Sequence, residues 1–188
     1  MPARRSRSGT GERENLEPPD GADLGPNPLD PAQASREAMT RALRLLSARP
    51  QTERELTDKL SRAGFGTGTI EGVLVRLREL RYVDDAAFAH QWVEERSRLR
   101  PIGRRALASE LVRKGIAPEH IETALAIYDQ GAELAAAQAL AARANARYAG
   151  LSADARQRKC YAYLVGRGFE HEVARAAACS GGPGRPEN

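Results

Sequence analysis

A leucine–glycine pattern that recurs three times, at intervals of about 50 residues, is the strongest constraint on the fold of this chain. Each copy reads Leu-x3-Leu-x3-Gly-Φ-x4-Φ, where Φ is an apolar residue, and the third copy has a cysteine in place of the first leucine. The copies occupy residues 56–70, 107–121 and 160–174. A period of this size is typical of an array of small helical units rather than of one closed globule. Such arrays commonly present an extended surface to a long or repeating partner.

The glycine of each copy indicates where a helix ends. A glycine just after the last apolar turn can adopt the left-handed conformation that closes a helix. With Gly64 at this position (C′), Leu60 is C3 and Phe65 is C″, and a hydrophobic contact between C3 and C″ commonly accompanies the cap. The same count gives two further pairs, Leu111 with Ile116 and Leu164 with Phe169. Agreement among three copies favours caps over the alternative that each glycine is an ordinary loop residue.

Signals for helix starts occur at matching places. Thr52 and Glu55 have the spacing of a capping box. Residues suited to an N-cap or to the first helical position precede the other apolar runs: Thr67, Asp84, Ser152 and Pro118. No segment alternates apolar and polar residues over the length of a strand. The expected helices cover residues 35–48, 52–63 and 67–81, then 85–99, 103–114 and 118–129, then 131–148, 152–166 and 170–179.

These helices predict an all-α, elongated array of three tandem three-helix repeats over residues 35–83, 84–130 and 131–179. Residues 1–34 are rich in proline and glycine and poor in apolar residues, which predicts a disordered tail, and residues 180–188 form a short loose tail. No stretch is apolar enough to serve as a secretory signal or to span a membrane. We expect a cytoplasmic monomer with two reduced cysteines, Cys160 and Cys179.

Basic residues gather in the second and third repeats. Residues 96–114 contain seven basic residues and one acid, Glu110, whereas residues 115–142 contain four acids and no lysine or arginine. This distribution predicts a basic surface suited to nucleic acid or to an acidic protein groove, with a merely solvated helix face as the alternative. The candidate binding residues are Arg96, Arg98, Arg100, Arg104, Arg105, Arg113, Lys114, Arg156, Arg158 and Lys159.

Catalytic and metal-binding patterns are not found in the sequence. The Gly-Thr-Gly-Thr run at residues 66–69 lacks the Gly-Lys-Ser/Thr ending of a phosphate-binding loop. Adjacent helical residues do not face each other, so Asp84 beside Asp85 is interpreted as an N-cap rather than as half of an acid–base pair. The remaining candidate ligands have no zinc spacing: His90, His120, His171, Cys160 and Cys179. We therefore expect a protein without catalytic residues, cofactor or metal.

Four segments combine into a wider pattern over residues 36–179. They are Glu55-Leu56-x2-Lys59-Leu60-x3-Gly64-Phe65, Tyr82-Val83-Asp84-Asp85-x2-Phe88-Ala89, Leu107-x2-Glu110-Leu111-x2-Lys114-Gly115-Ile116 and Leu164-x2-Arg167-Gly168-Phe169. Taken together they resemble the RecX regulatory proteins. The second segment in combination with Lys-Gly-Ile is the most specific part of the resemblance.

The resemblance implies a function as well as an elongated helical fold. RecX proteins bind the RecA recombinase, lodge in the helical groove of its filament on DNA, and inhibit its ATPase, strand-exchange and co-protease activities without a reaction of their own. The implied partners are RecA and the RecA–DNA filament, with direct contact to the DNA backbone as a further expectation. The chain departs from the family at Gly166, where arginine is frequent, in its alanine-rich third repeat, and in its long N-terminal tail.

A winged-helix transcription regulator is the main alternative, because residues 52–83 alone have the pattern of such a module. Two features oppose it. Asp84 begins another helix where the strands of a wing would follow, and the pattern then recurs twice. A helical scaffold for some other protein is the third interpretation.

Overall fold

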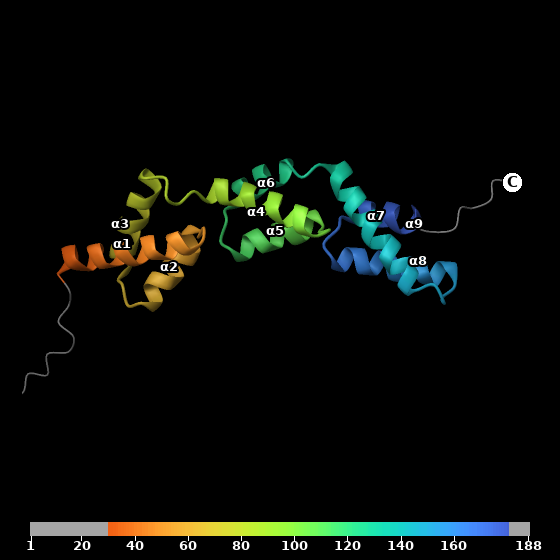
Figure 1. Cartoon of the computed structure of the whole chain (residues 1–188), viewed down its shortest axis with the longest axis horizontal. Coiled ribbons are helices and arrows are strands. Elements are labelled where there is room, and N and C mark those ends of the chain that lie inside the picture. Colours follow the sequence, from red (N-terminus) through yellow and green to blue (C-terminus); the bar gives the residue numbers. More distant parts are fainter. Residues whose placement is uncertain (1–29, 181–188) are drawn as a thin grey trace, which may run out of the picture.

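The computed structural model describes residues 30–180, which contain nine helices and no strand. The helices form three successive groups along one long axis (Figure 1). The first group is α1 (Pro31–Ala48), α2 (Glu53–Arg62) and α3 (Thr67–Glu79); the second is α4 (Asp85–Leu99), α5 (Arg104–Arg113) and α6 (Pro118–Ala126); the third is α7 (Gln130–Arg147), α8 (Ala153–Gly166) and α9 (His171–Ser180). The predicted all-α array of three-helix repeats is confirmed. The strands of a wing do not follow α3 in this part of the chain, which removes the structural basis of the winged-helix alternative.

Each repeat has a separate apolar core to which the leucine–glycine pattern contributes the same positions. Leu56 and Leu60 of α2 are fully buried, as are Leu107 and Leu111 of α5. In the third repeat the equivalent positions are Cys160 and Leu164, also fully buried. Small residues complete the third core, including Ala174, Ala177 and Ala178 of α9. Burial of the same positions three times explains the period of the sequence.

The three predicted helix caps are confirmed. The amide of Phe65 donates to the Leu60 carbonyl (3.3 Å) and the amide of Gly64 donates to the Ser61 carbonyl (2.9 Å). These two bonds define a Schellman motif, and Gly64 has the left-handed φ of +90° that the motif requires. The other two caps repeat the pattern, with Ile116 donating to Leu111, Phe169 donating to Leu164, and φ values of +80° at Gly115 and +84° at Gly168.

Several element ends differ from the predictions. α1 begins at Pro31 rather than at residue 35, because Asp30 caps it and proline suits the first helical position. The remainder of the predicted disordered tail, residues 1–29, lies outside the described residues, as does most of the C-terminal tail. Thr67 is the first residue of α3, and Gly66 occupies its N-cap. α3 ends early, in a turn where Arg81 adopts a left-handed φ of 56°.

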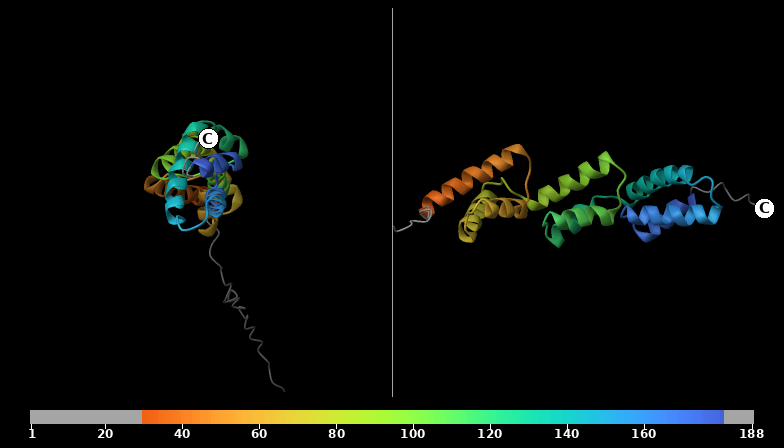
Figure 2. Two further views of the ribbon diagram at one scale, coloured as in Figure 1. Left: turned by 90° about the vertical axis from the view of Figure 1, so that its right-hand side faces the viewer. Right: turned by 90° about the horizontal axis from the view of Figure 1, so that it is seen from below.

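Successive repeats are joined head to tail through their second helices (Figure 2). The hydroxyl of Thr52, at the start of α2, donates to the carbonyl of Lys114 at the end of α5 (2.7 Å). The start of α5 meets the end of α8 in the same way, because the Arg105 amide donates to the Gly168 carbonyl (3.0 Å). Each junction therefore places the positive end of one helix dipole against the negative end of the next, a favourable arrangement.

Candidate partner-binding surface

A carboxylate from the following repeat reinforces each junction. Asp85 Oδ1, in the first turn of α4, accepts from the Glu53 amide at the start of α2 (3.0 Å). Glu133 Oε1, in the first turn of α7, accepts from the Arg104 amide at the start of α5 (2.8 Å). Burial, the largest effect, raises the pKa of Asp85. Because Asp85 accepts from the Glu53 amide, it caps α2 of the preceding repeat. Asp84 caps α4, as predicted, by accepting from the Ala87 amide (2.8 Å).

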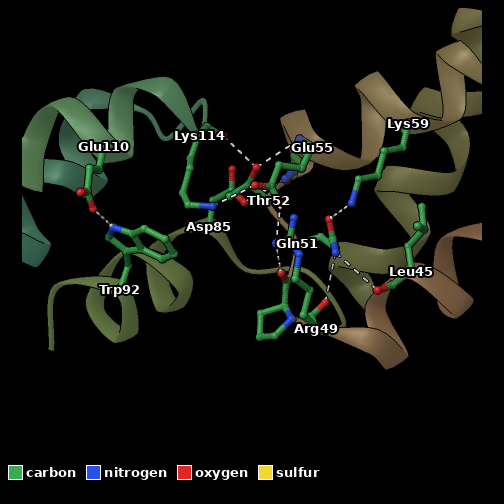
Figure 3. Close-up of polar contacts among 12 residues, drawn as sticks. Leu45, Arg49, Gln51, Thr52, Glu55, Lys59, Asp85, Trp92, Glu110 and Lys114 are labelled. Carbon is green, nitrogen blue, oxygen red and sulfur yellow. Dashed lines mark hydrogen bonds and ion pairs between the residues drawn. The ribbon is translucent and has the colours of Figure 1, made fainter. Parts of the chain in front are cut away.

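Lys114 lies inside the first junction rather than on an open surface (Figure 3). Its Nζ is 2.9 Å from Glu55 Oε1, and their side chains are only 16% and 20% exposed. The same ammonium lies over the indole of Trp92, 4.2 Å from the ring centroid. Burial alone would raise the pKa of Glu55, but hydrogen bonds from Lys114 and Arg49 outweigh it and the pKa is lowered.

This contact corrects half of the predicted capping box. Thr52 does accept from the Glu55 amide (3.2 Å). The Glu55 carboxylate instead pairs with Arg49 (2.9 Å) and with Lys114. Glu55 therefore joins two repeats, a role that its local spacing does not reveal.

Glu110 of α5 is the centre of a second polar cluster. It accepts from Arg96 Nε (2.8 Å) and from the indole N–H of Trp92 (3.0 Å), and it also pairs with Arg100 (3.2 Å). The hydrogen bond from Arg96 is the main cause of the lowered pKa of Glu110, burial acts in the opposite direction, and Trp92 adds to the lowering. Trp92 and its stacked neighbour Phe88 are partly buried against the core of the second repeat.

Intramolecular contacts divide the predicted binding residues into two groups. Five of the basic side chains in residues 96–114 have partners within the protein. Arg98 pairs with Glu94 (2.7 Å), and Arg104 donates to the Leu125 carbonyl (2.9 Å). The other three are Arg96 and Arg100, which pair with Glu110, and Lys114, which pairs with Glu55.

Arg105 and Arg113 remain exposed, and neither forms an ion pair within residues 30–180. Both line a groove that crosses the second junction, between α5 and the end of α8. We call this the junction groove, and its lining residues are Arg105, Ala106, Ser109, Glu110, Arg113, Val165, Gly166 and Gly168. Gly166 is the last residue of α8, and the space where its side chain would project is open. The groove presents two free guanidinium groups beside a carboxylate that other arginines already neutralise.

The predicted binding residues of the third repeat all lie on α8. Arg158 and Lys159 are exposed and Arg156 is half-buried. Lys159 Nζ lies 5.6 Å from the ring centroid of Tyr148. Arg175 of α9 joins Arg158 in lining one recess, although its isolated position in the sequence gave no signal of a site. The binding roles of all these residues stay predictions.

No three or more His, Cys, Asp or Glu side chains within residues 30–180 are grouped so as to hold a metal ion. Over the same range, no helix combines the length and the apolar character needed to cross a membrane.

The fold and the junction groove define a modular helical-repeat protein with a basic surface between repeats. Family models describe each repeat separately: "RecX, first three-helix domain" matches residues 38–77, the second domain matches 84–125, and the third matches 132–177. The chain belongs to the RecX family.

Relatives of known name support this assignment. Regulatory protein RecX of Mycobacterium sp. (strain JLS) is 43% identical over 115 residues, which cover 61% of this chain and 63%, less than two thirds, of that protein. The Streptomyces lividans protein of the same name is 36% identical over 153 residues, covering 81% of this chain and 80% of the relative. The crystal structure of RecX from Lactobacillus salivarius has the same fold, with a TM-score of 0.76 at 23% identity over 80% of this chain and 97% of that chain.

Proposed function

We propose that this chain regulates RecA by binding along the groove of the RecA–DNA filament, and that it inhibits the ATPase, strand-exchange and co-protease activities of RecA. The names of the relatives, Regulatory protein RecX, support a regulatory role. The observation that carries the proposal is the junction groove, where Arg105 and Arg113 project from an elongated array without an ion-pair partner in the described residues. A cytoplasmic location and a monomeric state stay predictions.

The mechanism we infer is bridging of neighbouring RecA protomers. Each repeat has its own core, and the junctions hold the repeats in line, so one molecule can contact more than one protomer at once. Arg105 and Arg113 would face acidic RecA surface or the DNA backbone. A bridge of this kind hinders the protomer movements, or the access to DNA, on which turnover depends.

Reversing the charge of the junction groove tests the proposal. The double variant Arg105→Glu/Arg113→Glu should raise the concentration needed to inhibit the RecA ATPase on single-stranded DNA by roughly tenfold or more, because it replaces attraction with repulsion. Arg104 is less suitable for this test because its side chain donates a hydrogen bond to the Leu125 carbonyl, so that replacing it would also remove a contact within the fold.

The matched control is Arg41→Glu/Arg44→Glu, which makes the same charge change on exposed positions of α1. It should inhibit nearly as well as the wild type, and both variants should keep their helical circular dichroism. Undiminished inhibition by the groove variant would refute the assignment of this surface.

The stoichiometry of inhibition tests the binding mode. Occupation of the groove along its length requires nearly as many molecules as there are binding sites on the filament. Strong inhibition at far lower ratios would indicate action at a filament end and would contradict the groove mode. Inhibition should also weaken as salt rises, since exposed charges are screened.

A further inference from the structure

A second basic recess lies between α8 and α9 of the third repeat, apart from the junction groove. Its lining residues are Gln157, Arg158, Tyr161, Arg175 and Ala178. Arg158 comes from α8 and Arg175 from α9, and both side chains are exposed. Neither pairs with a carboxylate in residues 30–180. Two free guanidinium groups on different helices thus converge on one recess, which favours an anionic ligand.

Tyr161 lines the same recess as these arginines, and its ring is held in place. The Tyr161 hydroxyl is 2.8 Å from His171 Nδ1, so a hydrogen bond to α9 fixes the ring on α8. The rings of Tyr161 and His171 form a tilted pair with centroids 6.2 Å apart. Tyr161 is only partly buried, and its ring lines the recess. A fixed aromatic ring beside free arginines is the combination with which proteins stack nucleic-acid bases and bind the adjoining phosphates.

The recess and the junction groove are separate, but α8 contributes lining residues to both. Arg158, Ala162 and Val165 recur at helical spacing and share one face of α8, with Gly166 beside Val165. Ala162 and Gly166 are exposed and small, so no large side chain interrupts this strip. Residues 158 and 166 are about 12 Å apart along the helix at 1.5 Å per residue. Arg158 thus lies at one end of this face of α8, and the junction groove with Arg105 and Arg113 lies at the other end.

We propose that the α8–α9 recess binds single-stranded nucleic acid, with Arg158 and Arg175 contacting a phosphate and Tyr161 stacking on the neighbouring base. The aromatic ring favours this ligand over an acidic protein segment, which would need only the charges. A single strand is favoured over a duplex because its bases offer free faces for stacking. This site concerns the chain alone and is independent of RecA.

Fluorescence anisotropy of a labelled oligothymidylate, with the full chain and without RecA, tests the charges and the ring separately. Arg158→Glu/Arg175→Glu should weaken binding by roughly tenfold or more. Tyr161→Ala should weaken it by roughly tenfold, whereas Tyr161→Phe keeps the stacking face and should remain close to the wild type. The charge-matched control on α1, Arg41→Glu/Arg44→Glu, should bind nearly as well as the wild type. Equal binding by all of these proteins would overturn the proposal.

The reactivity of Cys179 provides an independent test of where the oligonucleotide binds. Cys179 is exposed, and its Sγ is 2.9 Å from the amide nitrogen of Gln157, which lines the recess. Cys160 is buried and should not react in the folded protein. Oligothymidylate should slow the reaction of Cys179 with a thiol reagent in the wild type but not in Arg158→Glu/Arg175→Glu.

Two footprinting outcomes would overturn the assignment. Binding of the oligonucleotide without protection of Cys179 would place nucleic acid elsewhere on the chain. Protection by polyglutamate but not by oligothymidylate would identify an acidic protein segment as the ligand. The RecA ATPase assay separates this proposal from the previous one, because a chain that binds no oligonucleotide can still inhibit RecA.

Discussion

At the scale of single residues, the glycines that end the second helices combine a backbone role with a packing role. Gly64 and Gly115 both have left-handed φ angles, where an alanine is disfavoured by about 1–2 kcal/mol. Their surroundings differ. The space beside Gly64 is open, whereas a β-carbon on Gly115 would lie 2.3 Å from Arg54 Cδ of the neighbouring repeat.

Substituting these two glycines separates the roles. Gly64→Ala should lower the free energy of unfolding by about 1–2 kcal/mol, the backbone effect alone. Gly115→Ala should lower it further, because the Arg54 side chain must also move. Urea denaturation of the two variants measures the difference. Equal losses would show that the contact at Gly115 adjusts without penalty.

Glu110 makes the stability of the second repeat depend on pH. Its folded pKa is lowered, so the ionised carboxylate stabilises the fold above its ordinary pKa of 4.5, and this contribution is lost as the pH falls through the lower folded value. Trp92, the chain's single tryptophan, donates to Glu110 and should report the loss by fluorescence. Glu110→Gln should make the decline below pH 4.5 shallower. If stability fell as steeply in Glu110→Gln as in the wild type, the loss at low pH would be due to other carboxylates.

At the scale of elements, α5 tests the helix register that the repeat predicts. Leu111 is fully buried, and its carbonyl accepts from the Ile116 amide (3.1 Å). Leu111→Ala should lower the free energy of unfolding by about 2–5 kcal/mol. The adjacent Val112 is 58% exposed, so Val112→Ala should change it by less than about 0.5 kcal/mol. Similar losses for both variants in thermal or urea unfolding would contradict this register.

The elements that the sequence predicted well are those determined by local chemistry. The Schellman motif of Gly64 depends on residues within one turn, and so does the N-cap of Asp84. The early end of α3 was missed because arginine at position 81 occupies a left-handed conformation that glycine usually signals. The alanine-rich third repeat has a weak apolar pattern, but it was still predicted because Gly168 marks the end of α8.

At the scale of the whole molecule, the junctions could not be predicted because their partners are far apart in the sequence. Thr52 and Lys114 are 62 residues apart, and each has an adequate local explanation as a cap or as a surface charge. The candidate basic residues could not be separated from one another for the same reason, and their binding roles stay predictions. The sequence suggests Arg105, Arg113 and Arg96 alike, and only the fold shows that Glu110 neutralises Arg96.

The second junction depends on close approach of two backbones. Gly103 has an ordinary φ of −82°, but a β-carbon there would lie 2.1 Å from the carbonyl carbon of Gly168. Gly103→Ala should therefore separate the second and third repeats while each core stays folded. Small-angle X-ray scattering should show a changed shape at unchanged helical circular dichroism, and RecA inhibition should fall.

Gly150→Ala is the matched control, because the space beside Gly150 is open. Its scattering curve should coincide with that of the wild type. A Gly103→Ala protein with the wild-type curve would mean that the junction tolerates the extra atom.

The head-to-tail junctions also give the molecule a polarity. At each junction the start of one helix rests on the end of the next, always in the same order along the chain. The two tips of the array consequently differ: one exposes the C-terminal turn of α2, and the other exposes the N-terminus of α8. On a partner whose subunits all face one way, every bound copy must therefore point in the same direction.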